Sequence, residues 1–600
     1  MSSPTRFAYP RPPVRPLKIY ASDPMVGLDV RTRISIDTRN EPLLPGPAGA
    51  RIVVIDYDAT HDCFYKPVDL DDPAILMQGG IDHSESDPRF HQQMVYAVAS
   101  RIVSVFDRAL GRSVELSSEM KGGKPRPIRL YPHAFNGANA FYTEQAGGAI
   151  LFGYFRAVAD DPGANIPGQV VFSCLSHDVI AHELTHALID RLSPALKSSE
   201  HPDPLALHEG LSDLVPILDR FSLTSVVADE LRRTGGKLTT ASPLCFVAPQ
   251  FGAAIGLTHA LRTADMAADP RQYQEQTEPH ARGSILMSLT MEAVFQAYDA
   301  RVRDLYEIAG LKGPGDAVGP DLIARLATEA SRTALNVLTM YIRAFDYLPP
   351  IDVSFGDFLR AVVTADWELA PDDPGGQRAA LIEAFRRRGI YATGASSLAE
   401  RSLIWNRPEH QPEPLPASIV AALTRTAQSF RRIRPGEGEG SQEEAGVGSA
   451  ESLLVGWARR NARALHLGRG RTLKSEKPRY SFRVTRDGQL AVDIIARFIQ
   501  HSASGRPRGV TVIAGADGNI RYVIPNQPLP KIERAPAEAE AVTTTALAPP
   551  PDEPRVVSKP PFPARYRLSA AKYYKAYPHL KPPAAELKQL RDVTGEPHLP

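Results

Sequence analysis

Two histidines and a glutamate stand at a spacing suited to metal-assisted hydrolysis. They form the pentapeptide His182-Glu183-Leu-Thr-His186. The apolar spacing around it predicts an amphipathic helix over residues 178–190. On that helix the two histidines project from one face, because they are four residues apart, so both imidazoles could bind one zinc ion. Glu183 lies about 100° round the helix, where it can reach a water at the metal without being a ligand.

A catalytic zinc site needs three protein ligands and one open position. The best third ligand is Glu209, near the start of the next predicted helix. Asp213 follows four residues later on the same face and could accept the outer N–H of a ligating histidine. We also expect Asp178 to support the ligands from the first turn of the first helix. The alternative for Glu209 is an ordinary first-turn acid that the helix dipole favours.

These two helices resemble a known pair. Residues 178–190, followed by His208-Glu209-Gly-Leu-Ser-Asp213, are similar to the zinc helix and the ligand helix of the thermolysin family of gluzincin metallopeptidases. The resemblance covers about residues 85–300 by motif and extends to about residue 410 by helical pattern. It implies one zinc ion held by His182, His186 and Glu209.

Three shorter segments match the same family in the same order. Asn139-Ala140-Phe-Tyr resembles the edge strand that holds an extended substrate, which implies Asn139 and Ala140 as substrate-binding residues. The segment at Arg262 resembles the one whose arginine binds the substrate carbonyl. The segment at His280 resembles the one whose histidine donates to the tetrahedral oxyanion.

The supporting residues also have plainer interpretations. Asn139 could be a turn residue, Arg262 a solvated helix charge and His280 a loop histidine. If His280 is catalytic, an acid at Glu275 or Glu278 could orient it.

Two departures from the family pattern affect what the resemblance implies. The family places a tyrosine, a second oxyanion donor, where this chain has Lys197. The acidic cluster that binds paired calcium ions in the family is missing, so we expect no calcium.

The resemblance implies an α+β fold, with a β-rich N-terminal part and a mainly helical C-terminal part around the active-site helix. It also implies a zinc-dependent endopeptidase in which Glu183 is the general base. Two alternatives stay open: an aminopeptidase, and a zinc-bound scaffold or peptide-binding protein with weak or no turnover. Retention of Glu183 argues against the scaffold, because a structural zinc site does not need a base.

Composition narrows the remaining possibilities. The net charge of +1 gives no reason to expect a nucleic-acid partner. Cys63, Cys174 and Cys245 are odd in number and far apart, so the sequence predicts neither a disulfide framework nor a thiolate zinc site. The sequence shows neither a signal peptide nor a run long enough to span a bilayer. We therefore expect a cytoplasmic protein, with export by a signal-independent route left open.

Changes in composition predict six segments along the chain. Prolines gather at both ends, and a polar linker follows the helical part. We expect a protein partner, if any, to bind within residues 451–600, and a disordered tail apart from a short docking segment at 570–577. The predicted segments are a flexible lead, a β-rich peptidase part, the zinc helix with the helical part, a linker, a small α+β module and a Pro/Ala-rich tail: 1–20, 21–175, 176–410, 411–450, 451–526 and 527–600.

Overall fold

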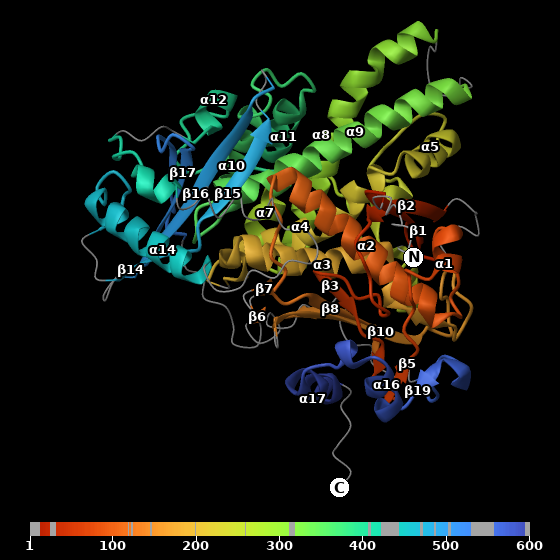
Figure 1. The fold of residues 1–600 in the computed structure, drawn as a ribbon. Helices are drawn as coiled ribbons and strands as arrows, with labels where there is room; N and C mark the ends of the chain where they lie inside the picture. The colour runs from red at the N-terminus through yellow and green to blue at the C-terminus, as the bar shows by residue number, and fades with distance from the viewer. Residues whose placement is uncertain are drawn as a thin grey trace, which may run out of the picture.

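The chain is a mixed α+β protein in which a helical body lies against a β-sheet (Figure 1). The computed structural model describes residues 12–24, 32–117, 119–121, 124–144, 147–198, 200–258, 260–310, 318–405, 410–421, 443–468, 472–484, 488–501, 506–529 and 557–593. Among these residues, no helix has both the length and the apolar content needed to cross a bilayer.

A five-stranded sheet forms the core of the N-terminal part. Its strands follow the order β11-β10-β8-β3, and β9 pairs with β10 beside β11. β10 runs parallel to β8 and antiparallel to β9 and β11. β9 pairs with no other described strand and is therefore an edge strand, as the sequence predicts. The five strands are β3 (Ile52–Val54), β8 (Ile128–Asn136), β9 (Ala140–Thr143), β10 (Ala149–Arg156) and β11 (Val170–Phe172).

Smaller strands and one short helix surround this sheet. β1 pairs antiparallel with β2, and β4 and β5 form a second hairpin. The elements are β1 (Val14–Tyr20), β2 (Arg33–Arg39), β4 (Tyr57–Asp58), β5 (Cys63–Tyr65), α1 (Pro73–Met77), β6 (Met120–Lys121) and β7 (Lys124–Pro125).

Four long helices build the centre of the helical body. They are α2 (Pro88–Leu110), α3 (His177–Leu192), α4 (Pro202–Phe221) and α9 (Pro320–Ala344). α3 contains the predicted zinc-binding residues and begins at a serine cap, where Ser176 Oγ accepts the amide of Val179 at 3.4 Å. Nearly every residue of α3 and α4 is buried, so their polar side chains must find partners inside the protein.

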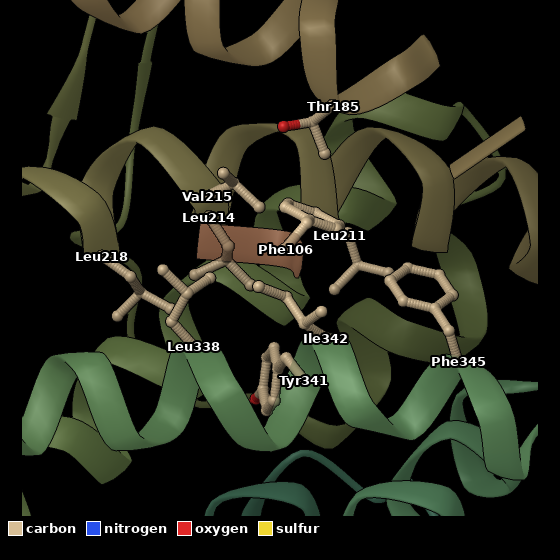
Figure 2. Close-up of a pocket in the computed structure, with 10 residues that line it drawn as sticks. All are labelled: Phe106, Thr185, Leu211, Leu214, Val215, Leu218, Leu338, Tyr341, Ile342 and Phe345. Carbon is tan, nitrogen blue, oxygen red and sulfur yellow. The ribbon is translucent and has the colours of Figure 1, made fainter. Parts of the chain in front are cut away.

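Apolar side chains pack α4 against its neighbours. Figure 2 shows a small cavity lined by side chains from α2, α3, α4, α9 and the turn after α9. Thr185 from α3 borders it, with its hydroxyl bonded back to the carbonyl of Ala181 at 2.7 Å. This close packing fixes α4, the predicted ligand helix, relative to α3. The lining residues are Phe106, Thr185, Leu211, Leu214, Val215, Leu218, Leu338, Tyr341, Ile342 and Phe345.

Further helices complete the body around this centre. The longest is α8, which packs along α4 and α9. The remaining elements are η3 (Ser173–Leu175), η4 (Pro194–Lys197), α5 (Thr224–Arg233), η5 (Pro243–Cys245), β12 (Phe246–Val247), α6 (Pro249–Ala254), β13 (Arg262–Thr263), α7 (Pro270–Glu275), α8 (Pro279–Ile308), η6 (Phe345–Tyr347), α10 (Phe355–Trp367), α11 (Gln377–Arg387) and α12 (Glu400–Leu403).

Residues 443–525 form the α+β module predicted after the linker, with one change of boundary. Its helix α14 (Glu443–Arg460) begins inside the segment predicted as linker. A five-stranded antiparallel sheet follows, in the order β14-β16-β17-β18 with β15 on β16. The strands are β14 (Thr472–Ser475), β15 (Arg479–Val484), β16 (Leu490–His501), β17 (Arg508–Gly515) and β18 (Ile520–Pro525).

The described part of the tail differs from its prediction, while residues 530–556 and 594–600 lie outside the described residues. Residues 557–593 contain secondary structure beyond the expected docking segment at 570–577, and they lie against the N-terminal strands (Figure 1). β19 pairs antiparallel with β5, and the Arg129 guanidinium on β8 forms a buried ion pair with Glu586 at 2.7 Å. Proline content suggested disorder, but the aromatic and apolar residues between the prolines supply a face that can pack. The elements are η7 (Ala564–Tyr566), β19 (Arg567–Leu568), α16 (Ala570–Ala576), η8 (Pro578–Leu580) and α17 (Ala584–Val593).

Candidate metal centre

The structure brings the three predicted zinc ligands together at one buried point. His182 Nε2 and His186 Nε2 lie 2.9 Å apart, and Glu209 Oε2 lies 3.6 Å from each. These three residues form one of the groups of side chains able to hold a metal ion. A point equidistant from the three atoms is about 2.0 Å from each, close to the usual Zn–N and Zn–O bond lengths of about 2.0–2.2 Å.

The outer ring nitrogens fix which nitrogens are free to bind a metal. His182 Nδ1 lies 2.9 Å from Asp213 Oδ1, as the sequence predicts, and a negative carboxylate at this distance favours the tautomer with the proton on Nδ1. His186 Nδ1 faces Ser212 Oγ at 3.2 Å, and that hydroxyl already donates to the carbonyl of His208. His186 Nδ1 is therefore protonated too. Both Nε2 atoms are then unprotonated and lie 3.6 Å from Glu209 Oε2, a buried oxygen without a hydrogen bond to the described residues, and a cation satisfies this arrangement.

Arg262 contacts Asp213. The resemblance implied only a contact between this arginine and a substrate carbonyl. Arg262 Nε donates to Asp213 Oδ2 at 2.7 Å. Burial opposes ionisation of Asp213, but the Arg262 charge and the neighbouring His182 lower its pKa to about 2. Arg262 Nη2 is buried and makes no hydrogen bond with the described residues.

Glu183 lies beside the ligands with nothing holding its carboxylate. It is fully buried, and neither oxygen makes a hydrogen bond of normal geometry with the described residues. Burial raises the pKa of Glu183 well above its ordinary value and the charge of Glu209 adds to this, while the backbone of Tyr142 and Arg262 act in the opposite direction. A carboxylate that resists ionisation next to a metal position is suited to accept and release a proton.

His280 reaches the same point from the start of α8. Its Nε2 lies 3.3 Å from Glu209 Oε2, and its Nδ1 lies 2.8 Å from Glu278 Oε1. Burial lowers the pKa of His280, but Glu209 and Glu278 outweigh it, so the pKa lies above the ordinary value. With 31% of its side chain exposed, His280 is the most accessible residue of the group, so the group opens to solvent on this side.

Of the two acids considered as partners of His280, Glu278 is the one in contact. Glu275 was selected for the site, but it lies exposed at the end of α7 and makes no described bond to His280. Glu278 caps α8 by accepting the amides of His280 and Ala281, which places its carboxylate against the imidazole.

Asp178 is a second correction, because it does not support the metal ligands. Its carboxylate accepts the amide of Ala248 at 3.0 Å and lies 3.2 Å from the Arg220 guanidinium. α3 and α4 run antiparallel, so the first turn of α3 meets the far end of α4 and not the turn that carries Glu209. Arg220 thus neutralises Asp178 one helical turn away from the zinc position.

The edge strand β9 lies beside the metal centre. β9 packs against α3, and the backbone of Tyr142 on β9 lies beside Glu183. The carbonyl of Asn139 accepts the amide of Gly153 on β10 at 2.9 Å, and its side-chain oxygen accepts the amide of Ala140. Asn139 and Ala140 therefore lie at the start of β9, the strand that lies next to the site.

Lys197 lies at the position where the resemblance would place a tyrosine. Lys197 Nζ binds Asp190 and Glu144, each at 2.7 Å, so it neutralises acids near the end of α3.

The ring of His208 packs edge-on against His186 with centroids 4.7 Å apart, and burial lowers the pKa of His208 to about 3. His208 thus acts as a neutral support for His186. The only signal for this role in the sequence is the position of His208 directly before Glu209.

Comparison with known proteins adds no assignment to this geometry. No protein-family model matches the chain, and no curated protein matches it. The chemistry of the site is therefore argued from its residues. Two imidazoles and one carboxylate with supporting partners on the outer nitrogens are the donor set of catalytic zinc sites.

Proposed function

We propose that this protein is a zinc-dependent metalloendopeptidase. The observation that carries the proposal is the convergence of His182, His186 and Glu209 on one point, with the unbonded carboxylate of Glu183 beside it. A site that only stabilises the fold would not need a buried acid without a hydrogen-bond partner beside its ligands. Here the chain supplies three ligands and a base.

The residues divide the work of peptide hydrolysis between them. Zinc, when bound, polarises the scissile carbonyl and lowers the pKa of a water to about 7. Glu183 takes the proton of the attacking water and delivers it to the leaving amine. His280 donates to the carbonyl oxygen as that oxygen becomes negative, a contribution worth about 3 kcal/mol. Asp213 and Arg262 hold His182 in the tautomer that leaves Nε2 free.

The edge strand suits an extended peptide segment as substrate. A peptide added beside β9 would take hydrogen bonds from the backbone of the strand and lie across α3. The aminopeptidase alternative needs an acid that binds the free amine of the substrate, and the sequence Gly147-Gly148-Ala149-Ile150, at the start of β10, has none. Internal cleavage is therefore the better fit.

One observation favours a zinc-bound peptide-binding protein with weak or no turnover. Lys197 is engaged with Asp190 and Glu144, so the second oxyanion donor of the family has no equivalent at that position. Loss of one such donor typically slows turnover by about 100- to 1,000-fold without preventing it. The two functions differ in whether peptide bonds are broken.

The test compares zinc-loaded wild type with Glu183→Gln at equal zinc content. Hydrolysis of a set of internally quenched peptides is measured for both, with a chelator-treated sample as the metal-free control. We expect cleavage by the wild type, none after chelation, and a loss of at least about 100-fold in Glu183→Gln. Zinc bound by an inert wild type would favour the binding protein instead.

A further inference from the structure

A second group of potential ligands lies buried between α2, β8 and the turn before α3. His91 Nδ1 and His133 Nε2 are 2.9 Å apart, and Cys174 Sγ lies 3.6 Å from the first and 3.9 Å from the second. All three side chains are fully buried. A point equidistant from these atoms is about 2.0 Å from each, which matches Zn–N bonds of about 2.0 Å and approaches Zn–S bonds of about 2.3 Å.

The protonation of His133 resembles that of His182 in the first site. His133 Nδ1 lies 2.7 Å from Asp56 Oδ1, so Nδ1 carries the proton and Nε2 presents a lone pair to the group. The other oxygen of Asp56 accepts the side-chain amide of Gln92 at 2.7 Å, which fixes the carboxylate. Histidine ligands of zinc commonly have such a carboxylate on their outer nitrogen.

A hydrogen bond between the two rings explains only part of this arrangement. It would account for the 2.9 Å separation, but it would leave unexplained why Cys174 Sγ lies within 4 Å of both ring nitrogens. The first site has nearly the same spacing, with 2.9 Å between nitrogens and 3.6 Å to the third ligand.

Aromatic rings seal the group from solvent. Phe172 packs edge-on against His91, with ring centroids 4.8 Å apart. Phe562, from the C-terminal segment, covers both histidines at 4.9 Å and 5.3 Å. In such a dry environment an ion is stable only when its charge is balanced. A divalent ion, one thiolate and the Asp56 carboxylate sum to zero, whereas a monovalent ion would leave a buried negative charge.

We propose that His91, His133 and Cys174 form a second metal site that binds one divalent, thiolate-binding ion such as zinc. The ion holds α2 and β8 against η3, the turn that precedes α3. Cys174 lies in this turn, which leads directly into the helix that carries His182. Its role is structural, because no ligand is accessible to a substrate. This differs from the sequence prediction of no thiolate zinc site, because the ligands are 41 to 83 residues apart along the chain.

Cobalt substitution tests this site separately from the peptidase site. The full-length protein is stripped of metal, kept reduced and loaded with Co²⁺ alone. We expect a thiolate-to-cobalt charge-transfer band in the near ultraviolet, which the His182–His186–Glu209 site cannot produce because it contains no sulfur. The band should remain in His186→Ala, which removes a ligand of that first site. Its outcome does not depend on whether the protein cleaves peptides.

Cysteine variants assign the band to one residue. Cys63→Ser and Cys245→Ser should keep it, and Cys174→Ser should abolish it and reduce bound zinc from about two ions per chain to about one. If Cys174→Ser fails to fold, retention of the band in the other two variants still assigns it to the remaining cysteine. Absence of the band in cobalt-loaded wild type, or its loss in Cys63→Ser or Cys245→Ser, would overturn the proposal.

Discussion

At the scale of single residues, the site depends on which oxygen or nitrogen each side chain leaves free. Asp213 and Ser212 occupy the outer nitrogens of the two histidines, so the inner nitrogens face Glu209. Glu278 plays the corresponding part for His280. These partners make no contact with the proposed zinc position, yet they determine the orientation of the groups that do.

Two neighbouring acids allow a matched test of how His280 is oriented. Glu278→Gln removes the carboxylate that lies 2.8 Å from His280 Nδ1, so we expect kcat for peptide hydrolysis to fall about 10-fold with zinc content unchanged. Glu275→Gln removes an exposed acid of the same size three residues earlier and should leave kcat unchanged. Equal effects of the two changes would show that Glu278 does not position His280.

At the scale of elements, two glycines bring the start of α8 onto α4. A Cβ at Gly210 would lie 2.7 Å from the carbonyl oxygen of Gly283, and a Cβ at Gly283 would lie 2.8 Å from the amide of Gly210. Gly210 follows Glu209, and Gly283 lies three residues after His280. The absence of both side chains therefore allows His280 to lie 3.3 Å from a zinc ligand.

Gly283→Ala should push α8 away from α4 and move His280. We expect kcat to fall about 10- to 100-fold, because small displacements of catalytic groups are costly, while zinc binding at the three ligands persists. Gly456→Ala is the matched control, since Gly456 also lies within a helix. A Cβ at Gly456 would meet only the flexible end of an arginine side chain, at an ordinary contact distance. Unchanged kcat in Gly283→Ala would contradict the role assigned to this contact.

The sequence predicted the parts of the site that depend on spacing along a helix. It missed contacts between residues that lie far apart along the chain. The pentapeptide at His182, the third ligand Glu209 and the outer partner Asp213 follow from positions along two helices, and the structure brings them together. Asp178 was misplaced because its partner comes from the other end of α4. Cys174 was dismissed because spacing along the chain does not show which distant histidines it meets.

At the scale of the whole molecule, the C-terminal module caps the zinc helix. Arg479 and Arg497 from the module's sheet each donate to the carbonyl of Leu192, the last residue of α3, at 2.7 Å. Cations suit this end of a helix because its carbonyls lack partners and carry the negative end of the dipole. The module thus helps to fix the C-terminal end of α3, so removing it would alter the helix that carries His182 and His186.

Arg497→Gln should destabilise the protein through the loss of this cap. The side chain is buried and also donates to Phe345, so we expect the free energy of unfolding to fall by about 3 kcal/mol. Arg506→Gln, an exposed change in the same module, should alter it by less than about 0.5 kcal/mol. Denaturant unfolding of both variants measures the difference, and similar values would show that the cap contributes nothing.

The proposed role of Glu183 as the base of a zinc peptidase can be measured as the ratio of kcat/KM between wild type and Glu183→Gln. Both proteins are assayed at full length on one quenched peptide with their zinc content measured. We predict a ratio of at least about 100 at equal zinc occupancy, because the change removes the proton acceptor and keeps every ligand. Cleavage at the same rate by both proteins would contradict the account.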